Sequence, residues 1–325
     1  MSGAPRNTIL IGDALTRLRA LPTASVDCVV TSPPYYQLRD YGVTGQLGLE
    51  ANVDDWAEAL RLVLAEVGRV LAPTGSLWLN LADSFSRHPR YGASAKSLLL
   101  APERMLLALA EDGWLVRNKV VWAKPNPMPN PVRDRLTLTY EVVYLLVRGP
   151  RYFFDLDAIR APVGKPVERM HARHASWAAP LASDRDWLKR PGADRSGHPL
   201  GKNPGDVWTI PPQPFRGAHF ATFPEALVRR PLLATCPEAV CTACRQPWRR
   251  RPSAVAQPGP LKPCGCDAPA VPGLVLDPFF GTGTVGVVAT QLGRDWLGIE
   301  PSPAYAELAR QRLGHNSTEP MRAAA

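Results

Sequence analysis

The sequence predicts an α/β fold whose mostly parallel β-sheet is covered by helices on both faces. Short apolar segments of strand character alternate with segments whose apolar residues recur at helical spacing. One late strand, over 274–277, runs directly into a glycine-rich turn and then a helix. Strands that alternate with helices form parallel sheets with helices against both faces. At 325 residues, 45% of them hydrophobic, the chain can bury such a core as one domain with insertions.

The first half of the chain contains the elements of this pattern in regular order. Residues 8–11 and 26–31 are short apolar runs that end at polar or proline-rich turns, as buried strands do. Between them, leucines recur at helical intervals over 13–21. The same criteria predict a helix over 55–71 that Pro73 and Gly75 end, a strand over 76–81, a helix over 97–112, and strands over 116–122 and 140–148.

The second half contains the longest irregular stretches and the last elements. The 35 prolines cluster in 124–133, 160–216 and 252–272, which predicts loops because proline lacks the backbone donor that helices and sheets require. Regular structure resumes after residue 220. We expect a helix over 224–233, a strand over 274–277, a helix over 284–292, a strand over 296–300 and a helix over 303–313, which brings the strands to seven.

Composition indicates a basic protein without a membrane segment. The formal net charge of +9 favours a polyanionic partner, because lysine and arginine neutralise phosphates. Segment 151–220 combines basic residues, histidines and tryptophans, which suits contact with DNA, although a solvated insertion has a similar composition. No apolar run is long enough to span a bilayer, and no signal-peptide pattern opens the chain. We therefore expect a cytoplasmic protein associated with DNA.

A glycine-rich turn after the strand over 274–277 predicts a nucleoside-binding loop. The turn reads Asp277-Pro-Phe-Phe-Gly-Thr-Gly-Thr284, and its glycines allow backbone amides to approach a ligand closely. Glu300 ends the next strand, where its carboxylate can accept hydrogen bonds from both ribose hydroxyls. Gly281-x-Gly283-x-x-Gly286 also fits the dinucleotide fingerprint of nicotinamide enzymes. That alternative requires most of the nucleotide-binding sheet to follow the loop, and too little chain remains.

A second motif lies near the other end of the chain, where the strand over 26–31 runs into Thr31-Ser32-Pro33-Pro34-Tyr35. The prolines fix the backbone, so the Ser32 hydroxyl and the Pro33 carbonyl are held in fixed directions. Two such acceptors can bind both N–H groups of an exocyclic amine while Tyr35 stacks on the ring. Alone, the motif is more typical of a turn that ends a strand. The glycine-rich loop elsewhere in the chain favours the functional interpretation.

Together and in this order, the two motifs resemble those of the beta class of DNA amino-methyltransferases, which carry the target-base motif ahead of the cofactor motif. The resemblance covers residues 8–160 and 204–313. It implies a Rossmann-like, seven-stranded methyltransferase fold, in which Ser32, Pro33, Pro34 and Tyr35 act on the target base. It also implies S-adenosylmethionine as methyl donor, bound by Asp277, Pro278, Phe279, Gly281, Gly283, Thr284 and Glu300.

Looser matches to the same family extend the site. Asp13 resembles a position near the adenine of the donor, and it is equally suited to cap a helix. Thr222 and Phe223 resemble the segment beside the methionine part, where core packing is the alternative role for Phe223. Residues that resemble the border of the base pocket, and that would contact DNA or remain exposed loop charges, are Lys124, Arg133 and Arg135.

The type of base follows from one residue of the target motif. In this family a serine before the prolines is typical of cytosine-N4 enzymes, and an aspartate of adenine-N6 enzymes. Ser32 therefore favours N4-methylcytosine, with N6-methyladenine as the alternative. Amine methylation requires no covalent nucleophile, and Cys28 lies in an apolar strand, so we expect it to be a buried core thiol.

Four of the six cysteines have the spacing of a zinc site. Cys241-x2-Cys244 and Cys264-x-Cys266 are separated by 19 residues, which suits four thiolate ligands. Disulfides are rare in cytoplasmic proteins. The alternative is a folded surface excursion with reduced thiols. The same insert contains Trp248 and three consecutive arginines from Arg249, so it could also contact DNA.

These observations predict a site-specific methyltransferase that acts on a cytosine flipped out of double-stranded DNA. It would work as a monomer or homodimer, with or without a partner restriction endonuclease. Remoter alternatives are a nicotinamide-dependent oxidoreductase and a non-catalytic DNA-binding module. The expected division of the chain is a target-base half over 1–150, a target-recognition region over 151–215, a cofactor half over 216–237 and 271–315, a zinc insert over 238–270 and a disordered tail over 316–325.

Overall fold

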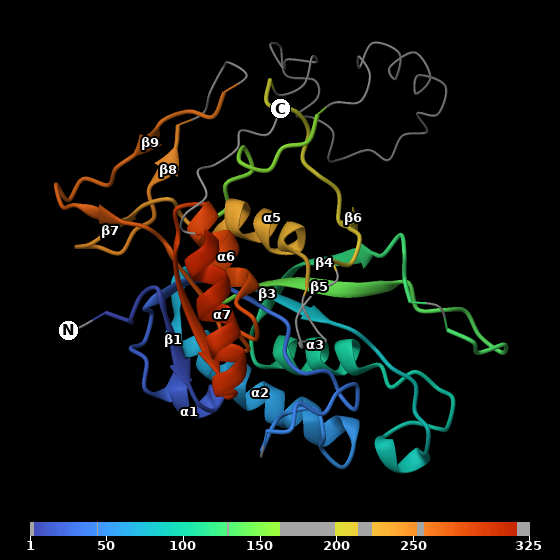
Figure 1. Cartoon of the computed structure of the whole chain (residues 1–325). Helices are drawn as coiled ribbons and strands as arrows, with labels where there is room; N and C mark the ends of the chain where they lie inside the picture. Colours follow the sequence, from blue (N-terminus) through green and yellow to red (C-terminus); the bar gives the residue numbers. More distant parts are fainter. Residues whose placement is uncertain are drawn as a thin grey trace, which may run out of the picture.

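The protein is built around one large β-sheet (Figure 1). The computed structural model describes residues 3–43, 45–128, 130–162, 199–213, 223–251 and 257–316. Within these residues the sheet has eight strands in the order β1-β12-β11-β2-β3-β5-β4-β6. They are β1 Thr8–Ile11, β2 Val26–Thr31, β3 Leu71–Leu81, β4 Leu115–Ala123, β5 Tyr140–Val147, β6 Val207–Thr209, β11 Leu274–Asp277 and β12 Asp295–Glu300.

Most of the strands run parallel, as expected. Only β5 runs against its two neighbours, β3 and β4. The other adjacent pairs are parallel, and the three residues Val29, Val275 and Leu297 at the centre of the sheet are completely buried. Burial on both faces explains why these strands are continuous apolar runs rather than alternating ones. The predicted α/β class with a mostly parallel sheet is confirmed.

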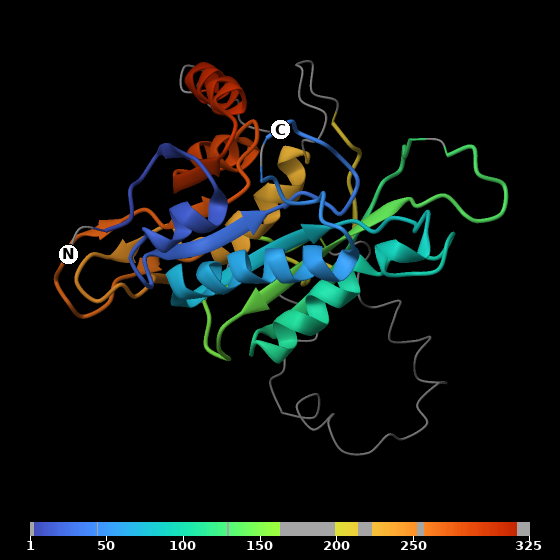
Figure 2. The ribbon, with the colours of Figure 1, turned by 90° about the horizontal axis from the view of Figure 1, so that it is seen from below.

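Helices cover both faces of the sheet (Figure 2). One face packs against α1 Ala14–Arg19, α2 Val53–Val70 and α3 Ala101–Glu111, and the other against α5 Glu225–Thr235, α6 Thr284–Gln291 and α7 Pro303–Asn316. Helix α2 shows how sequence determines this packing. Its apolar residues recur on one stripe, where Trp56, Leu60 and Leu64 are at most 1% exposed, and the Asn52 side chain caps its first turn.

Three elements differ from the predictions. The sheet has one strand more than the expected seven, because β6 pairs in parallel with β4 and packs Trp208 on Trp78 at 5.8 Å. Its three residues, in a proline-rich stretch, are too few to show an alternating pattern. Strand β3 begins five residues earlier than expected, since Leu71 pairs with Val26. Helix α3 begins at Ala101, because Leu100 has a left-handed backbone.

The residues between α5 and β11 form a small separate unit, which we call the cysteine insert (238–270). Within it, β7 Val240–Cys241 pairs with β10 Ala270–Val271, and β8 Arg249–Arg250 pairs with β9 Leu261–Lys262, both antiparallel. Both views show it at the opposite side of the molecule from the long loop that joins β4 and β5.

Several predictions concern residues outside the described ranges. These are residues 163–198 and 214–215 of the expected recognition region, 216–222 of the expected cofactor half with Thr222, 252–256 of the expected zinc insert, and all of the expected tail except Asn316, with which α7 ends. Among the helices that the structure describes, none combines the length and apolarity needed to cross a membrane.

Candidate active site

A pocket lies at the carboxyl ends of β1, β2, β11 and β12, where both sequence motifs meet. Parallel strands place the segments that follow them at one edge of the sheet, so distant parts of the chain converge there. The pocket is lined by Asp13, Ala14, Ser32, Pro34, Tyr41, Val43, Gly45, Gln46, Leu47, Phe223, Phe279, Phe280, Gly281, Thr282, Thr284, Glu300, Pro301 and Tyr305. Eight of the predicted site residues are therefore brought together in one cavity.

The predicted cofactor loop, Asp277–Thr284, is held by Glu300. The Glu300 carboxylate accepts hydrogen bonds from Gly281 N at 2.8 Å and from Ser302 N at 2.9 Å. It is only 5% exposed, and burial raises its pKa. Each carboxylate oxygen has a second lone-pair site, so Glu300 keeps acceptor capacity on its pocket side.

Close packing under the loop requires glycine at two positions. Gly283 precedes α6 with a left-handed backbone, φ +77°. At Gly298 in β12 a Cβ atom would lie 2.3 Å from the Phe280 ring, which stacks on Trp296 at 5.3 Å. The Phe280 ring thus fills the space above Gly298 and fixes the loop against the sheet.

Asp277 joins the cofactor loop to the target motif. Its carboxylate accepts hydrogen bonds from Thr31 Oγ1 at 2.7 Å and from Phe279 N at 3.0 Å. Burial raises the pKa of Asp277 to about 7, because the side chain is 1% exposed and has no cationic partner among the residues that the structure describes. Among the predicted site residues that the structure describes, Asp277, Pro278 and Gly283 do not line the pocket, and neither do Pro33 and Tyr35 of the target motif.

Asp13 caps helix α1, which is one of the two roles that its sequence position allowed. Its Oδ1 accepts from Thr16 N and Thr16 Oγ1, each at 2.8 Å, and so caps helix α1. The same residue lines the pocket beside Ala14.

The target motif, Thr31–Tyr35, is locked by contacts from three other elements. Trp56 Nε1 of α2 donates to Pro34 O at 3.0 Å. The Tyr35 hydroxyl donates to Glu141 Oε2 of β5 at 2.7 Å and lies 3.1 Å from Asn80 Oδ1 of β3. These contacts hold the backbone and the tyrosine ring in one orientation.

The direction of the hydrogen bonds gives Ser32 a defined role. Burial and the nearby Glu141 carboxylate raise the pKa of Tyr35 well above 10, so its hydroxyl keeps its proton. That single proton goes to Glu141, and the 2.9 Å contact between Ser32 Oγ and Tyr35 Oη is then a donation by Ser32. The lone pairs of Ser32 Oγ are left to accept hydrogen bonds from the pocket.

The predicted DNA contacts have different surroundings. Lys124 forms an ion pair with Glu141 and lies 4.7 Å from the Trp122 ring centre, so it belongs to the network behind Tyr35. Arg133 is exposed on the β4–β5 loop, and the Arg135 guanidinium stacks on Phe85 at 3.5 Å. That loop extends well away from the sheet (Figure 1).

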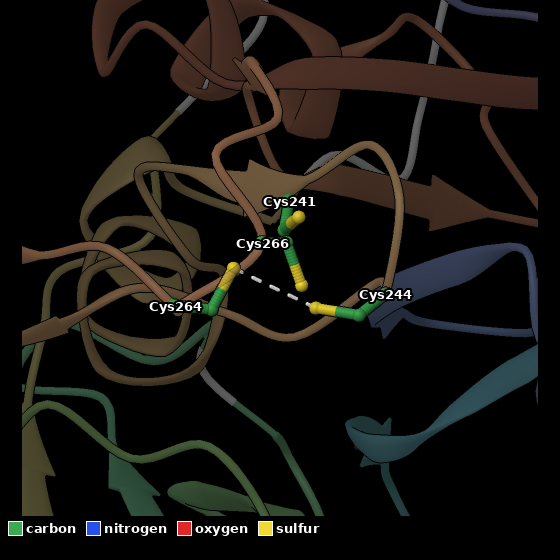
Figure 3. Close-up of side chains that lie close together, drawn as sticks. All are labelled: Cys241, Cys244, Cys264 and Cys266. Carbon is green, nitrogen blue, oxygen red and sulfur yellow. Dashed lines mark hydrogen bonds between the residues drawn. The ribbon is translucent and has the colours of Figure 1, made fainter.

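The four cysteines of the predicted metal site converge in the cysteine insert (Figure 3). Their sulfur atoms all lie within 4.8 Å of one another, and those of Cys244 and Cys264 are 3.6 Å apart. This separation is much longer than a disulfide bond. Cys28 and Cys236 lie elsewhere, completely buried in the core, and burial raises the pKa of Cys28 to about 12. The prediction that Cys28 is a buried core thiol is confirmed.

The sequence assigned no role to several residues of the pocket and of the hydrogen-bond network around Tyr35. Tyr41 and Gln46 come from the segment after the target motif, and Tyr305 comes from α7. Asn80 and Glu141 lie within strands and reach the target motif through side-chain contacts across the sheet. In the sequence, Tyr140-Glu141 resembles the family stretch that borders the base pocket, but this likeness does not indicate the contact between Glu141 and Tyr35.

Comparisons with known proteins agree with this geometry. The Type II methyltransferase M.Cfr9I of Citrobacter freundii is 34% identical over 98% of this chain and 91% of that protein. M.XycI of Xanthomonas campestris pv. cyanopsidis is 35% identical over 96% of this chain and 89% of that protein. M.SmaI of Serratia marcescens is 34% identical, with 94% of this chain and 90% of that protein covered.

Solved structures show the same fold. The cytosine-N4-specific PvuII DNA methyltransferase superposes with a TM-score of 0.60 at 19% identity, over 95% of this chain and 87% of that one. A putative DNA modification methylase of Thermus thermophilus, complexed with S-adenosyl-L-methionine, gives a TM-score of 0.55 at 23% identity over 95% of both chains. The family model described as DNA methylase, N6_N4_Mtase, matches residues 26–311. The chain therefore belongs to this family of DNA amino-methyltransferases.

Proposed function

We propose that the protein transfers the methyl group of S-adenosylmethionine to the N4 amine of a cytosine flipped out of double-stranded DNA. The observation that carries the proposal is the shared pocket, which is lined by Ser32 and Pro34 of the target motif, by Gly281 of the cofactor loop and by Glu300 at the end of β12. A methyl acceptor and a methyl donor could be held in contact there. Holding both reactants in one site removes much of the entropic barrier to transfer.

The donor would be held by the cofactor loop. Glu300 has acceptor capacity for the ribose hydroxyls, and the described residues Phe223 and Phe279 add apolar walls. Asp277 keeps the loop aligned with Thr31 from below, as a positioning residue. When bound, S-adenosylmethionine supplies a sulfonium methyl group as the electrophile.

The target amine would be polarised by two acceptors. Ser32 Oγ has lone pairs directed away from Tyr35, and among the described residues none donates to Pro33 O. Hydrogen bonds from both N–H groups to these oxygens draw the nitrogen lone pair out of conjugation with the ring, so that it can attack a methyl group. The ring of Tyr35, fixed through its hydroxyl, would stack on the base.

The choice of cytosine rests on Ser32. An aspartate in this position would add a negative charge next to the carbonyl of Pro33, whereas serine leaves a smaller, neutral acceptor. The name of one structural neighbour, the cytosine-N4-specific PvuII enzyme, agrees with this choice. The Type II names of the relatives support a role in which this chain methylates a specific DNA site. The methylation would protect that site from a partner restriction endonuclease.

The β4–β5 loop would contact the duplex beside the flipped base. It carries the exposed Arg133, the partly exposed Arg135, and Met128 and Leu136, which are 88% and 90% exposed. Basic residues neutralise phosphates, and exposed apolar side chains can occupy the space that an extruded base leaves. Lys124, held by Glu141, would act at the pocket itself.

The four thiolates of the cysteine insert would hold a structural zinc ion. Zinc–sulfur bonds of about 2.3 Å in a tetrahedron place the sulfur atoms about 3.8 Å apart. The sulfur atoms of Cys244 and Cys264 are already 3.6 Å apart, and all four lie within 4.8 Å. The donor set therefore fits the metal with movements of the sulfur atoms of about 1 Å or less.

The test is to treat unmethylated DNA with enzyme and donor and to identify the modified nucleoside by mass spectrometry. We expect N4-methylcytosine, and sequencing sensitive to methylation then gives the site. Pro33→Ala and Tyr35→Ala should abolish transfer while calorimetry still detects donor binding. N6-methyladenine as product would overturn the choice of base, and full turnover by either variant would overturn the role of the target motif.

A further inference from the structure

The cysteine insert contacts the sheet at the end opposite to the pocket. Arg245, which directly follows the metal-site residue Cys244, reaches the beginning of β2. Its Nη2 donates to Asp27 Oδ1 at 3.0 Å and lies 3.4 Å from Ser25 O. The pocket lies beyond the other end of β2, after Thr31.

Asp27 is a buried carboxylate that connects two central strands. It is 5% exposed, and its second oxygen accepts from the backbone N of Leu274, the first residue of β11, at 2.8 Å. A carboxylate in this environment is costly unless a positive group lies beside it. Arg245 is the residue of the insert that supplies this charge.

The backbone conformation of Arg245 also indicates that its side chain is placed there to reach Asp27. Its φ is +59°, in the left-handed region that favours glycine or asparagine. The turn from Cys241 to Arg245 is closed by a hydrogen bond from Arg245 N to Cys241 O at 3.0 Å. A glycine would relieve the backbone, but only a long cationic side chain at this position can reach Asp27.

We propose that the metal site is a clamp on the catalytic sheet. The metal, bound by the four cysteines, holds the turn from Cys241 to Arg245 in the conformation that directs Arg245 onto Asp27. Asp27 in turn holds the start of β11 beside β2. Loss of the metal therefore weakens the pairing of these two strands and not only the insert. This inference rests on the zinc site proposed above.

The alternative role of the insert is contact with DNA, as its arginines suggested. Two of the three are engaged with protein groups. Arg249 donates to Tyr152 O at 3.1 Å and Arg250 forms ion pairs with Asp155 and Glu238. They connect the insert to the segment after β5, again at the end of the sheet away from the pocket. This placement favours a structural role for the insert.

The test compares metal removal in the wild type and in Arg245→Met, with Arg251→Met as a matched control because Arg251 is an exposed arginine of the same insert. Zinc content is measured on all three proteins as purified, and we expect one ion per chain. Chelation should lower the midpoint of thermal unfolding of the wild type and the control by about 5–10 °C. Arg245→Met should have a lower midpoint than the wild type before chelation. Chelation should then lower the midpoint of this variant by less than half of the decrease in the wild type. Zinc added back should restore the wild type.

Hydrogen exchange gives a local readout on the same samples. The amide of Leu274 should exchange faster in the wild type after chelation, and at an equally raised rate in Arg245→Met with or without metal. If Arg245→Met does not fold, Asp27→Asn serves in its place, since it removes the charge that Arg245 compensates.

An equal loss of stability on chelation in wild type and variant, with Leu274 protected throughout, would show that the metal supports the insert alone. Absence of bound zinc would overturn the clamp too, whereas the identity of the methylated base is independent of all these measurements.

Discussion

Strands β2 and β11 are tied together at both ends by buried aspartates, and the two ties differ in their chemistry. At the carboxyl end Asp277 of β11 accepts from Thr31 of β2, a neutral partner. At the amino end Asp27 of β2 accepts from the backbone of Leu274 in β11 and pairs with the charged Arg245. The first tie lies beneath the pocket, and the second lies under the cysteine insert.

The difference indicates where the molecule supports catalysis and where it supports stability. Burial raises the pKa of both carboxyl groups, but at Asp27 the Arg245 guanidinium offsets part of the rise. The amino-end tie is therefore an ion pair supplied by a separate unit of the chain. At the carboxyl end, Asp277 is a buried acid that has no cationic partner among the described residues and that aligns two motifs of the site; acids with a raised pKa are common at functional sites.

A large effect on turnover is expected from Ser32→Ala at the carboxyl end. The change removes one of the two proposed acceptors of the target amine and leaves Tyr35 bonded to Glu141. Loss of one preorganised polar contact in an active site costs about 10²–10³ in turnover. We expect a fall of this size in kcat for methyl transfer, measured with radiolabelled donor, and an unchanged thermal midpoint. A variant that keeps more than half of the wild-type turnover would remove Ser32 from the mechanism.

A smaller effect is expected from Glu141→Gln, which acts on the same site through Tyr35. The variant keeps the shape of the side chain but replaces a charge-assisted hydrogen bond by a neutral one, a loss of about 1–2 kcal/mol. That corresponds to about tenfold in kcat. Donor affinity, measured by calorimetry, should not change.

Glu103→Gln is the matched control for Glu141→Gln, because Glu103 pairs with Lys119 on the surface and makes no contact with the target motif. It should keep wild-type turnover. If the two variants lose activity equally, the effect of Glu141 is not transmitted through Tyr35.

The sequence was sufficient for those parts of the site that are continuous in the chain. Ser32 and Pro34 of the target motif and Gly281 of the cofactor loop lie in short continuous motifs, and they converge on one pocket as expected because parallel strands end at one edge. The four cysteines also converge, as expected from two closely spaced pairs whose spacing suits one four-thiolate site.

The parts that could not be predicted depend on register across the sheet. Glu141 meets Tyr35 only because β5 runs antiparallel to β3, with Asn80 opposite Val143. Arg245 meets Asp27 because the insert folds back on strands that lie more than 200 residues away in sequence. Strand β6 is an edge strand of three residues, whose position is determined by its pairing with β4. Local patterns contain no information on any of these contacts.

At the amino end, Asp27→Ala should affect stability and not turnover. It leaves the buried N–H of Leu274 without its acceptor, which costs about 1–3 kcal/mol. We expect this loss in the free energy of unfolding, measured with urea, and a kcat of the folded protein within about twofold of wild type. Asp27→Asn keeps an acceptor and should lose less. A loss of turnover without a loss of stability would make the two ends of β2 functionally equivalent and end the distinction between them.

The last effect is a change of stability with pH that belongs to the carboxyl end. The folded protein binds the proton of Asp277 with a pKa of about 7, whereas the ordinary value of 3.8 applies to the unfolded chain. Between these values the folded state holds more protons, so the contribution of Asp277 to stability is greatest at low pH and falls as the pH rises from about 4 to about 7. The Asp277→Asn variant has no titratable group at this position, so its stability lacks this pH-dependent contribution. The thermal midpoint of the wild type should therefore fall relative to that of Asp277→Asn as the pH is raised across this window, and the difference should level off above it. A constant difference between the two proteins from pH 4 to pH 8 would mean that Asp277 is ionised throughout, as a carboxylate beside a cation would be.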